Sequence, residues 1–152
     1  MTAKEFAAQI GGRKRGKELT ADEKRLAKDS GLVVVYGASD DLMEIDGAVD
    51  DEADCFDGGT FHINRNGLVR CRDEDGEFCN DCPYFKAELA SAMELTAVWH
   101  DKGNPCWTYK TDIPHEEFAV YDDDEPDQLF GIGIVFSLED LPVANGGTSI
   151  EN

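Results

Sequence analysis

An uninterrupted apolar run, LVVVYG at residues 32–37, is the feature that most constrains how this chain folds. Its consecutive valines favour an extended strand. A strand without polar alternation is typical of the middle of a sheet, where both faces are covered. The sequence therefore predicts a buried central strand, with the other elements arranged around it.

Two short helices are predicted before this strand. Residues 3–10 carry apolar side chains four positions apart, which is the spacing of one helical face. Thr20 and Glu23 form a capping box, in which each side chain bonds the backbone amide of the other residue. This motif predicts a second helix over about 21–29.

The rest of the chain reads mainly as strands and turns. Residues 42–49 alternate, with Met43 and Ile45 on one face and Glu44 and Asp46 on the opposite face, which we expect to be solvated. Three hairpins and a helix complete the pattern: 60–64 with 68–71, 96–100 with 106–111, 117–121 with 129–138, and helical spacing over 84–95. The predicted fold is α+β, with an N-terminal helical pair followed by a mostly antiparallel sheet and one further helix.

The length of 152 residues predicts a single domain over 1–141. Its helical part, 1–30, is basic, and its sheet-rich part, 31–141, is acidic; we expect 142–152 to be a disordered tail. No apolar run is long enough to span a bilayer, and the first residues lack the layout of a signal peptide. We therefore expect a cytoplasmic protein.

Charge is divided unevenly along the chain. Residues 1–28 carry 8 of the 14 Lys and Arg with 4 acids, whereas residues 29–152 carry 29 acids and 6 bases. Such a field repels nucleic acid and acidic membranes and attracts basic surfaces. Carboxylates on alternate strand residues lie about 7 Å apart, comparable to phosphates along one DNA strand. The predicted partner-binding carboxylates are Asp40, Asp41, Glu44, Asp46, Asp50, Asp51 and Glu52.

Two aromatic residues are candidate anchors for the same partner. Trp107 and Tyr109 fall in CWTYKTDIPHEEF at 106–118, and Trp and Tyr are enriched at protein interfaces. The alternative is that both side chains belong to a core strand.

The cysteines give the strongest metal signal. Cys79 and Cys82 form a Cys-x2-Cys pair that offers two thiolates from one turn, and Cys71 would be a third ligand. Structural zinc takes four ligands, and the fourth is open among Cys55, Cys106, His100 and His62. The alternative is a set of ordinary reduced cysteines, and the fold requires no cofactor.

Catalytic patterns are weak throughout the chain. A calcium loop over 39–54 fails, because Met43 and Ile45 fall where an EF-hand needs oxygen ligands. The chain has no nucleophile elbow, phosphate loop or complete dinucleotide fingerprint. We therefore expect that the protein is not an enzyme.

Three segments resemble a family of small proteins from phages and prophages of Gram-positive and gut bacteria: EFAAQIGGRKRGKELT near the start, GLVVVYGASDDLMEIDGAVDDE at 31–52, and CWTYKTDIPHEEF with GIGIVFSLEDL. The resemblance spans most of 5–141, and it implies a phage context without a settled function. DCPYF at 81–85 also resembles this family, which supports a structural role for Cys82.

These observations together predict a phage accessory protein that binds a basic surface of a host nucleic-acid-handling or defence protein. It would inhibit that protein by mimicking DNA, without itself contacting nucleic acid or membrane. One alternative is a binder that sequesters a nucleotide signal, with Arg70 and Arg72 near the phosphates. Another is a zinc-stabilised structural module, which predicts a homo-oligomer.

Overall fold

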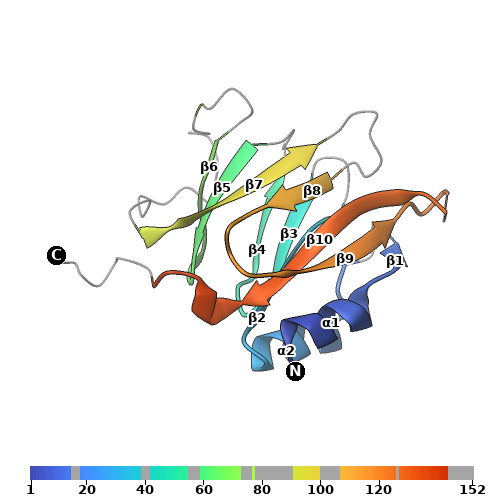
Figure 1. Ribbon diagram of the computed structural model, residues 1–152, viewed down its shortest axis with the longest axis horizontal. Helices are drawn as coiled ribbons and strands as arrows, with labels where there is room; N and C mark the ends of the chain where they lie inside the picture. The colour runs from blue at the N-terminus through green and yellow to red at the C-terminus, as the bar shows by residue number, and fades with distance from the viewer. Residues whose placement is uncertain are drawn as a thin grey trace.

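A computed structural model of the protein describes residues 1–14, 18–38, 42–54, 59–72, 77, 91–99, 107–125 and 127–143. Two helices, α1 (Ala3–Ile10) and α2 (Ala21–Asp29), flank the two-residue strand β1 (Arg13–Lys14), and a mixed sheet completes the fold (Figure 1). The α+β class and the N-terminal helical pair are confirmed.

Both helices begin with a capping box. The hydroxyls of Thr2 and Thr20 each accept a hydrogen bond of 3.1 Å from the amide three residues on. In return, the carboxylates of Glu5 and Glu23 accept hydrogen bonds from the amides of Thr2 and Thr20 at 2.9 and 2.8 Å. The helices differ in how they pack, because α1 buries Phe6, Ala7 and Ile10, whereas in α2 the fully buried residue is Ala27.

Ten strands of the described residues form one sheet. After β1 the strands are β2 (Leu32–Gly37), β3 (Leu42–Gly47), β4 (Asp51–Asp54), β5 (Gly59–Asn64), β6 (Gly67–Arg72), β7 (Met93–Trp99), β8 (Trp107–Lys110), β9 (Glu116–Tyr121) and β10 (Leu129–Ser137). Their order is β4-β3-β2-β10-β8-β7-β5-β6, and β9 pairs with both β10 and β1. The pairs β1–β9 and β8–β10 are parallel and the other pairs are antiparallel. The predicted central strand is confirmed, because β2 lies between β3 and β10.

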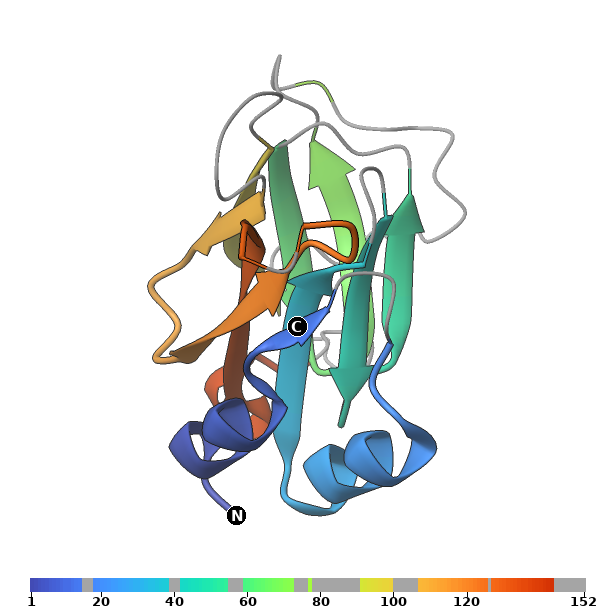
Figure 2. The same ribbon diagram turned by 90° about the vertical axis from the view of Figure 1, so that its right-hand side faces the viewer.

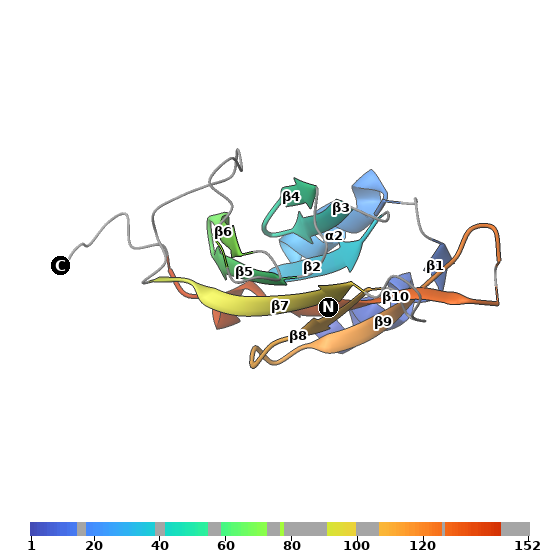
Figure 3. The same ribbon diagram turned by 90° about the horizontal axis from the view of Figure 1, so that it is seen from above.

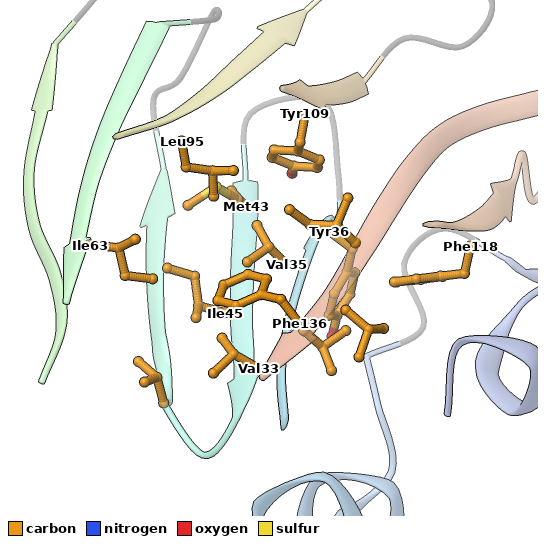
Figure 4. Close-up of a cluster of buried hydrophobic side chains, with 14 of the residues drawn as sticks. Val33, Val35, Tyr36, Met43, Ile45, Ile63, Leu95, Tyr109, Phe118 and Phe136 are labelled. Carbon is orange, nitrogen blue, oxygen red and sulfur yellow. The ribbon is translucent and has the colours of Figure 1, made fainter. Parts of the chain in front are cut away.

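The inner face of this curved sheet holds the apolar core (Figure 4). Val35 of β2 lies opposite Ile45 of β3, and Val33 lies opposite Phe136 of β10. All of these side chains are fully buried. Seen from above, β3 and β4 lie on one side of the molecule and β7 and β8 on the other (Figure 3). The two helices sit side by side at one end of the strands (Figure 2).

The helix predicted over 84–95 is wrong at its C-terminal end. Residues 93–95 begin strand β7, where Met93 pairs with Ile63 and Leu95 pairs with Phe61. Pairing with β5 on one side and β8 on the other overrides the helical spacing of the apolar residues. Residues 84–90 lie outside the described residues. After the strands, the described chain has only a 3-10 turn at Leu138–Asp140.

The described chain continues to residue 143, two residues past the predicted boundary at 141. The amide of Arg65 donates to the carbonyl of Pro142 at 3.0 Å. The Arg65 guanidinium also donates to the Leu141 carbonyl at 2.9 Å. Pro142 is therefore held against the β5–β6 turn, and residues 144–152 of the predicted tail lie outside the described residues.

The two outer strands of the sheet, β4 and β6, meet through a side chain. The carboxylate of Asp51 in β4 accepts a hydrogen bond of 3.0 Å from the backbone amide of Leu68 in β6. Asp51→Ala should therefore lower the free energy of unfolding by about 1–2 kcal/mol, because it leaves a partly buried amide without its acceptor. Chemical denaturation of the two proteins measures this difference.

Asp50, the neighbour of Asp51, provides a control for this contact between β4 and β6, which we call the β4–β6 seam. Asp50 is exposed, so Asp50→Ala should leave stability nearly unchanged. Asp51→Asn retains an acceptor oxygen and should recover most of the lost stability. Equal stability of the two alanine variants would contradict a structural role for Asp51.

Candidate acidic surface

The two β3 carboxylates predicted to face solvent are buried. Glu44 exposes 7% of its surface and Asp46 exposes none. Lys24 of α2 brings its Nζ within 3.6 Å of Asp46 Oδ1, so the helix lies over this face of the strand. The prediction of a solvated binding face at Glu44 and Asp46 is wrong, because alternation separates the faces of a strand without showing what packs on each.

A buried tyrosine organises the surroundings of Asp46. The Tyr36 hydroxyl on β2 donates a hydrogen bond of 2.7 Å to Asp46 Oδ2. The same hydroxyl accepts a bond of 3.2 Å from the backbone amide of Leu19, which precedes α2. Tyr36 therefore ties the start of α2 to the sheet, and one of the predicted binding residues is part of the structural core.

Burial raises the pKa of the Asp46 carboxyl above its usual value, although the Tyr36 hydrogen bond and Lys24 act in the opposite direction. Partial burial lowers the pKa of Lys24, but the carboxylates of Asp46, Glu18, Asp50 and Glu44 outweigh this and raise it overall. The desolvation cost of the pair thus falls on Asp46. A raised carboxyl pKa favours the folded state below the unfolded-state value, and that stability is lost as the pH rises through the folded-state pKa.

Of the other predicted carboxylates, the structure describes the side chains of Asp50 and Asp51. Asp50 is exposed, and Asp51 is half-buried at the β4–β6 seam. Asp40 and Asp41, and the side chain of Glu52, lie outside the described residues. Of the predicted set, Asp50 therefore remains as the described carboxylate that is open to solvent.

The predicted aromatic anchors belong to the core. Trp107 exposes 1% and Tyr109 exposes 5%, and their rings stack with centroids 6.3 Å apart. The indole lies so close to Gly37 that a Cβ there would be 2.7 Å from Trp107 Cδ1. A partner could not reach these rings in the folded chain, so the prediction that they are surface anchors is wrong. The Tyr109 hydroxyl is buried and has no hydrogen-bond partner among the residues that the structure describes.

The zinc prediction stays a prediction, because only Cys71 and His62 of its candidate ligands lie among the described residues. Cys71 lies on β6 opposite Phe61 and is buried in the apolar cluster of the sheet. His62, a candidate fourth ligand, lies next to Phe61 on the opposite face of β5, where its Nε2 is 3.4 Å from Glu94 Oε2. Cys71 and His62 therefore point to opposite faces and cannot share one metal. Cys79, Cys82, Cys55, Cys106 and His100 lie outside the described residues.

A different set of carboxylates is exposed at the turn between β9 and β10, which projects at one end of the molecule (Figure 1). Asp123, Asp124, Glu125 and Asp127 are exposed and Asp122 is half-exposed; we call these five residues the acidic hairpin. The side-chain oxygens of Asp122, Asp123 and Asp124 lie within 4.8 Å of one another. The hairpin therefore concentrates negative charge on one projecting turn.

The sequence predicts this turn between 117–121 and 129–138, but the predicted binding carboxylates do not include it. Residues 122–127 contain five acids among six residues, whereas 50–55 contains four. Local density of charge, combined with a turn between two strands, was therefore the available signal. The turn is held by backbone and side-chain bonds, since the amide of Asp124 donates to Asp122 Oδ1 at 2.9 Å and the amide of Asp122 donates to the Gln128 carbonyl at 2.9 Å.

The arginines proposed for a nucleotide lie on the outer face of β6. Arg70 is opposite His62, which in turn is opposite Glu94 of β7, and Arg72 is opposite Thr60. A carboxylate thus occupies the row in which a phosphate would have to bind. This arrangement argues against an anion site at this face.

A shallow groove of about 510 Å³ lies between the end of α1, β1 and the start of α2. Arg13 lines it, and its guanidinium is held by the Glu18 carbonyl at 3.0 Å and by the Glu23 carboxylate at 3.3 Å. Lys14 lines the same groove, so its described lining sets two cations beside the two carboxylates of Glu18 and Glu23.

No helix among the described residues is long and apolar enough to cross a bilayer. Comparisons of the chain with protein-family models, with curated proteins and with solved structures gave no match.

Proposed function

We propose that this protein is a non-enzymatic accessory protein, of the type carried by phages and prophages, that binds and inhibits a host nucleic-acid-handling or defence protein. The observation that supports this proposal is the acidic hairpin on a chain with a net charge of −19. Its carboxylates project from a turn, so they reach into a concave site more easily than a flat face does.

A cationic channel is the surface that fits this hairpin. Proteins that bind nucleic acids neutralise phosphates with clustered Lys and Arg side chains. A dense group of carboxylates in place of phosphates competes for the same cations and accelerates encounter through long-range attraction. The acidic hairpin thus excludes nucleic acid from the channel while it is bound.

Neutralising the hairpin should weaken this binding. The variant Asp123→Asn/Asp124→Asn/Glu125→Gln retains Asp122, whose side chain accepts the bond within the turn. Its dissociation constant for a basic nucleic-acid-binding protein captured from bacterial lysate should rise by about tenfold or more at low salt. Displacement of labelled DNA from the captured protein measures both affinity and inhibition.

A second triple variant with the same net charge distinguishes the contribution of the acidic hairpin to binding from that of the protein's overall charge. Asp29→Asn/Glu139→Gln/Asp140→Asn removes the same number of exposed charges from other parts of the described surface. It should bind nearly as tightly as the wild type. Equal weakening by the two triple variants, or binding that does not decrease with salt, would rule out the hairpin as the contact surface.

A further inference from the structure

The buried carboxylates of β3 form a second acidic face beneath α2. We infer that α2 is a displaceable cover over this face, and that an arginine of the basic partner replaces Lys24 at Asp46 when the cover opens. This inference rests on the proposed function, because it names a second contact of the same partner and its regulation.

Asp46 is incompletely satisfied in the closed state. Its Oδ2 accepts the Tyr36 hydrogen bond, whereas its Oδ1 is buried and accepts no hydrogen bond from the described part of the chain. Lys24 Nζ lies 3.6 Å from Oδ1, which is longer than the 2.7–2.9 Å or so of a charge-assisted hydrogen bond. A buried carboxylate oxygen that faces a cation without bonding it is a site for a better donor.

Arginine is the better donor at this position. Its guanidinium presents several N–H groups in a planar fork and is less strongly hydrated than an ammonium group, so it suits a buried carboxylate. Lys24 is also shared, since its Nζ lies 3.6 Å from Glu18 Oε1 as well as from Asp46. Displacement therefore exchanges a divided, long contact for a direct bond.

The attachment of α2 rests on few side chains. The helix has nine residues, of which Ala27 is fully buried and Leu26 is partly buried against the core. A helix of this length is marginal without tertiary contacts, so its position depends on these two residues, on Lys24, on the Arg13–Glu23 ion pair and on the bond from Leu19 to Tyr36. Opening would expose Glu44 and Asp46 beside Asp50, which is already exposed after β3.

Amide hydrogen exchange of the full-length protein tests the cover directly. An octa-arginine peptide should raise the exchange rate of the α2 amides at 21–29 by about tenfold, while the β10 amides remain protected. Lys24→Met should raise α2 exchange without peptide, whereas Lys24→Arg, which retains the cation, and Lys28→Met, at an exposed site of the same helix, should not. In Asp46→Asn the peptide should no longer accelerate α2 exchange.

The outcomes distinguish the cover from the proposed function. Peptide binding through the acidic hairpin with unchanged or slower α2 exchange would overturn the cover alone. No peptide binding to the wild type, with its fold intact, would overturn both proposals. Faster exchange across α2 and β10 together would show global unfolding and would also overturn a local cover.

Discussion

Replacing Gly47 with alanine should lower the free energy of unfolding by about 3–5 kcal/mol. Gly47 ends β3 with φ at 99°, a conformation that is strained for an alanine. An added Cβ would also overlap the Leu32 carbonyl oxygen. That oxygen cannot retreat freely, because it accepts a hydrogen bond of 2.9 Å from the Ala48 amide.

The same substitution also bears on α2. The added Cβ would lie 3.0 Å from the Cβ of Ala27, the residue through which the helix packs on β3. Relief of this contact moves the helix away from the strand. Thermal or chemical denaturation should therefore show reduced stability, and exchange of the α2 amides should be faster than in the wild type at the same temperature.

A second glycine with positive φ distinguishes the cost of steric overlap at Gly47 from the cost of its backbone conformation. Gly12 has φ at 84°, and a Cβ there would meet nothing within 4 Å. Gly12→Ala should therefore lose only about 1–2 kcal/mol, which is the backbone penalty alone. If the two variants lost equal stability, the close packing of Gly47 against Leu32 and Ala27 would be excluded as the cause.

The elements of this fold that sequence predicts well are those set by local chemistry. Capping at Thr20 depends on residues three apart, and β2 is recognised because its apolar run excludes exposure on either face. The 84–95 prediction fails where Met93 and Leu95 pair with residues about thirty positions earlier. Helical spacing in an amphipathic segment cannot reveal such a long-range pairing.

The candidate site was harder to predict, because exposure is a tertiary property. Alternation correctly separates Met43 and Ile45 from Glu44 and Asp46. The face that carries Glu44 and Asp46 is covered by α2, and the sequence predicts this helix without showing where it packs. The basic N-terminal part thus neutralises some acidity within the same chain, through Lys24. The exposed carboxylates at 122–127 lie where a turn between two paired strands prevents burial.

Two buried tyrosines should respond in opposite directions to loss of the hydroxyl. Tyr36→Phe should lower the free energy of unfolding by about 2–3 kcal/mol, because it removes the donor to Asp46 and the acceptor for Leu19 in one step. Tyr109→Phe should raise it by about 1 kcal/mol, since its buried hydroxyl has no partner within the described residues. Denaturation of both variants under one condition measures the two effects.

Comparison of Tyr36→Phe with Tyr109→Phe isolates the contribution of the hydroxyl hydrogen bonds to stability. Each change removes the same oxygen from a ring that is at least nine-tenths buried, so differences in apolar burial largely cancel. Burial raises the pKa of both hydroxyls, so each remains protonated at neutral pH. A loss of similar size at Tyr109 would show that its hydroxyl is satisfied in solution. An unchanged stability at Tyr36 would remove the tyrosine link between α2 and β3, and with it the reason that Asp46 tolerates complete burial.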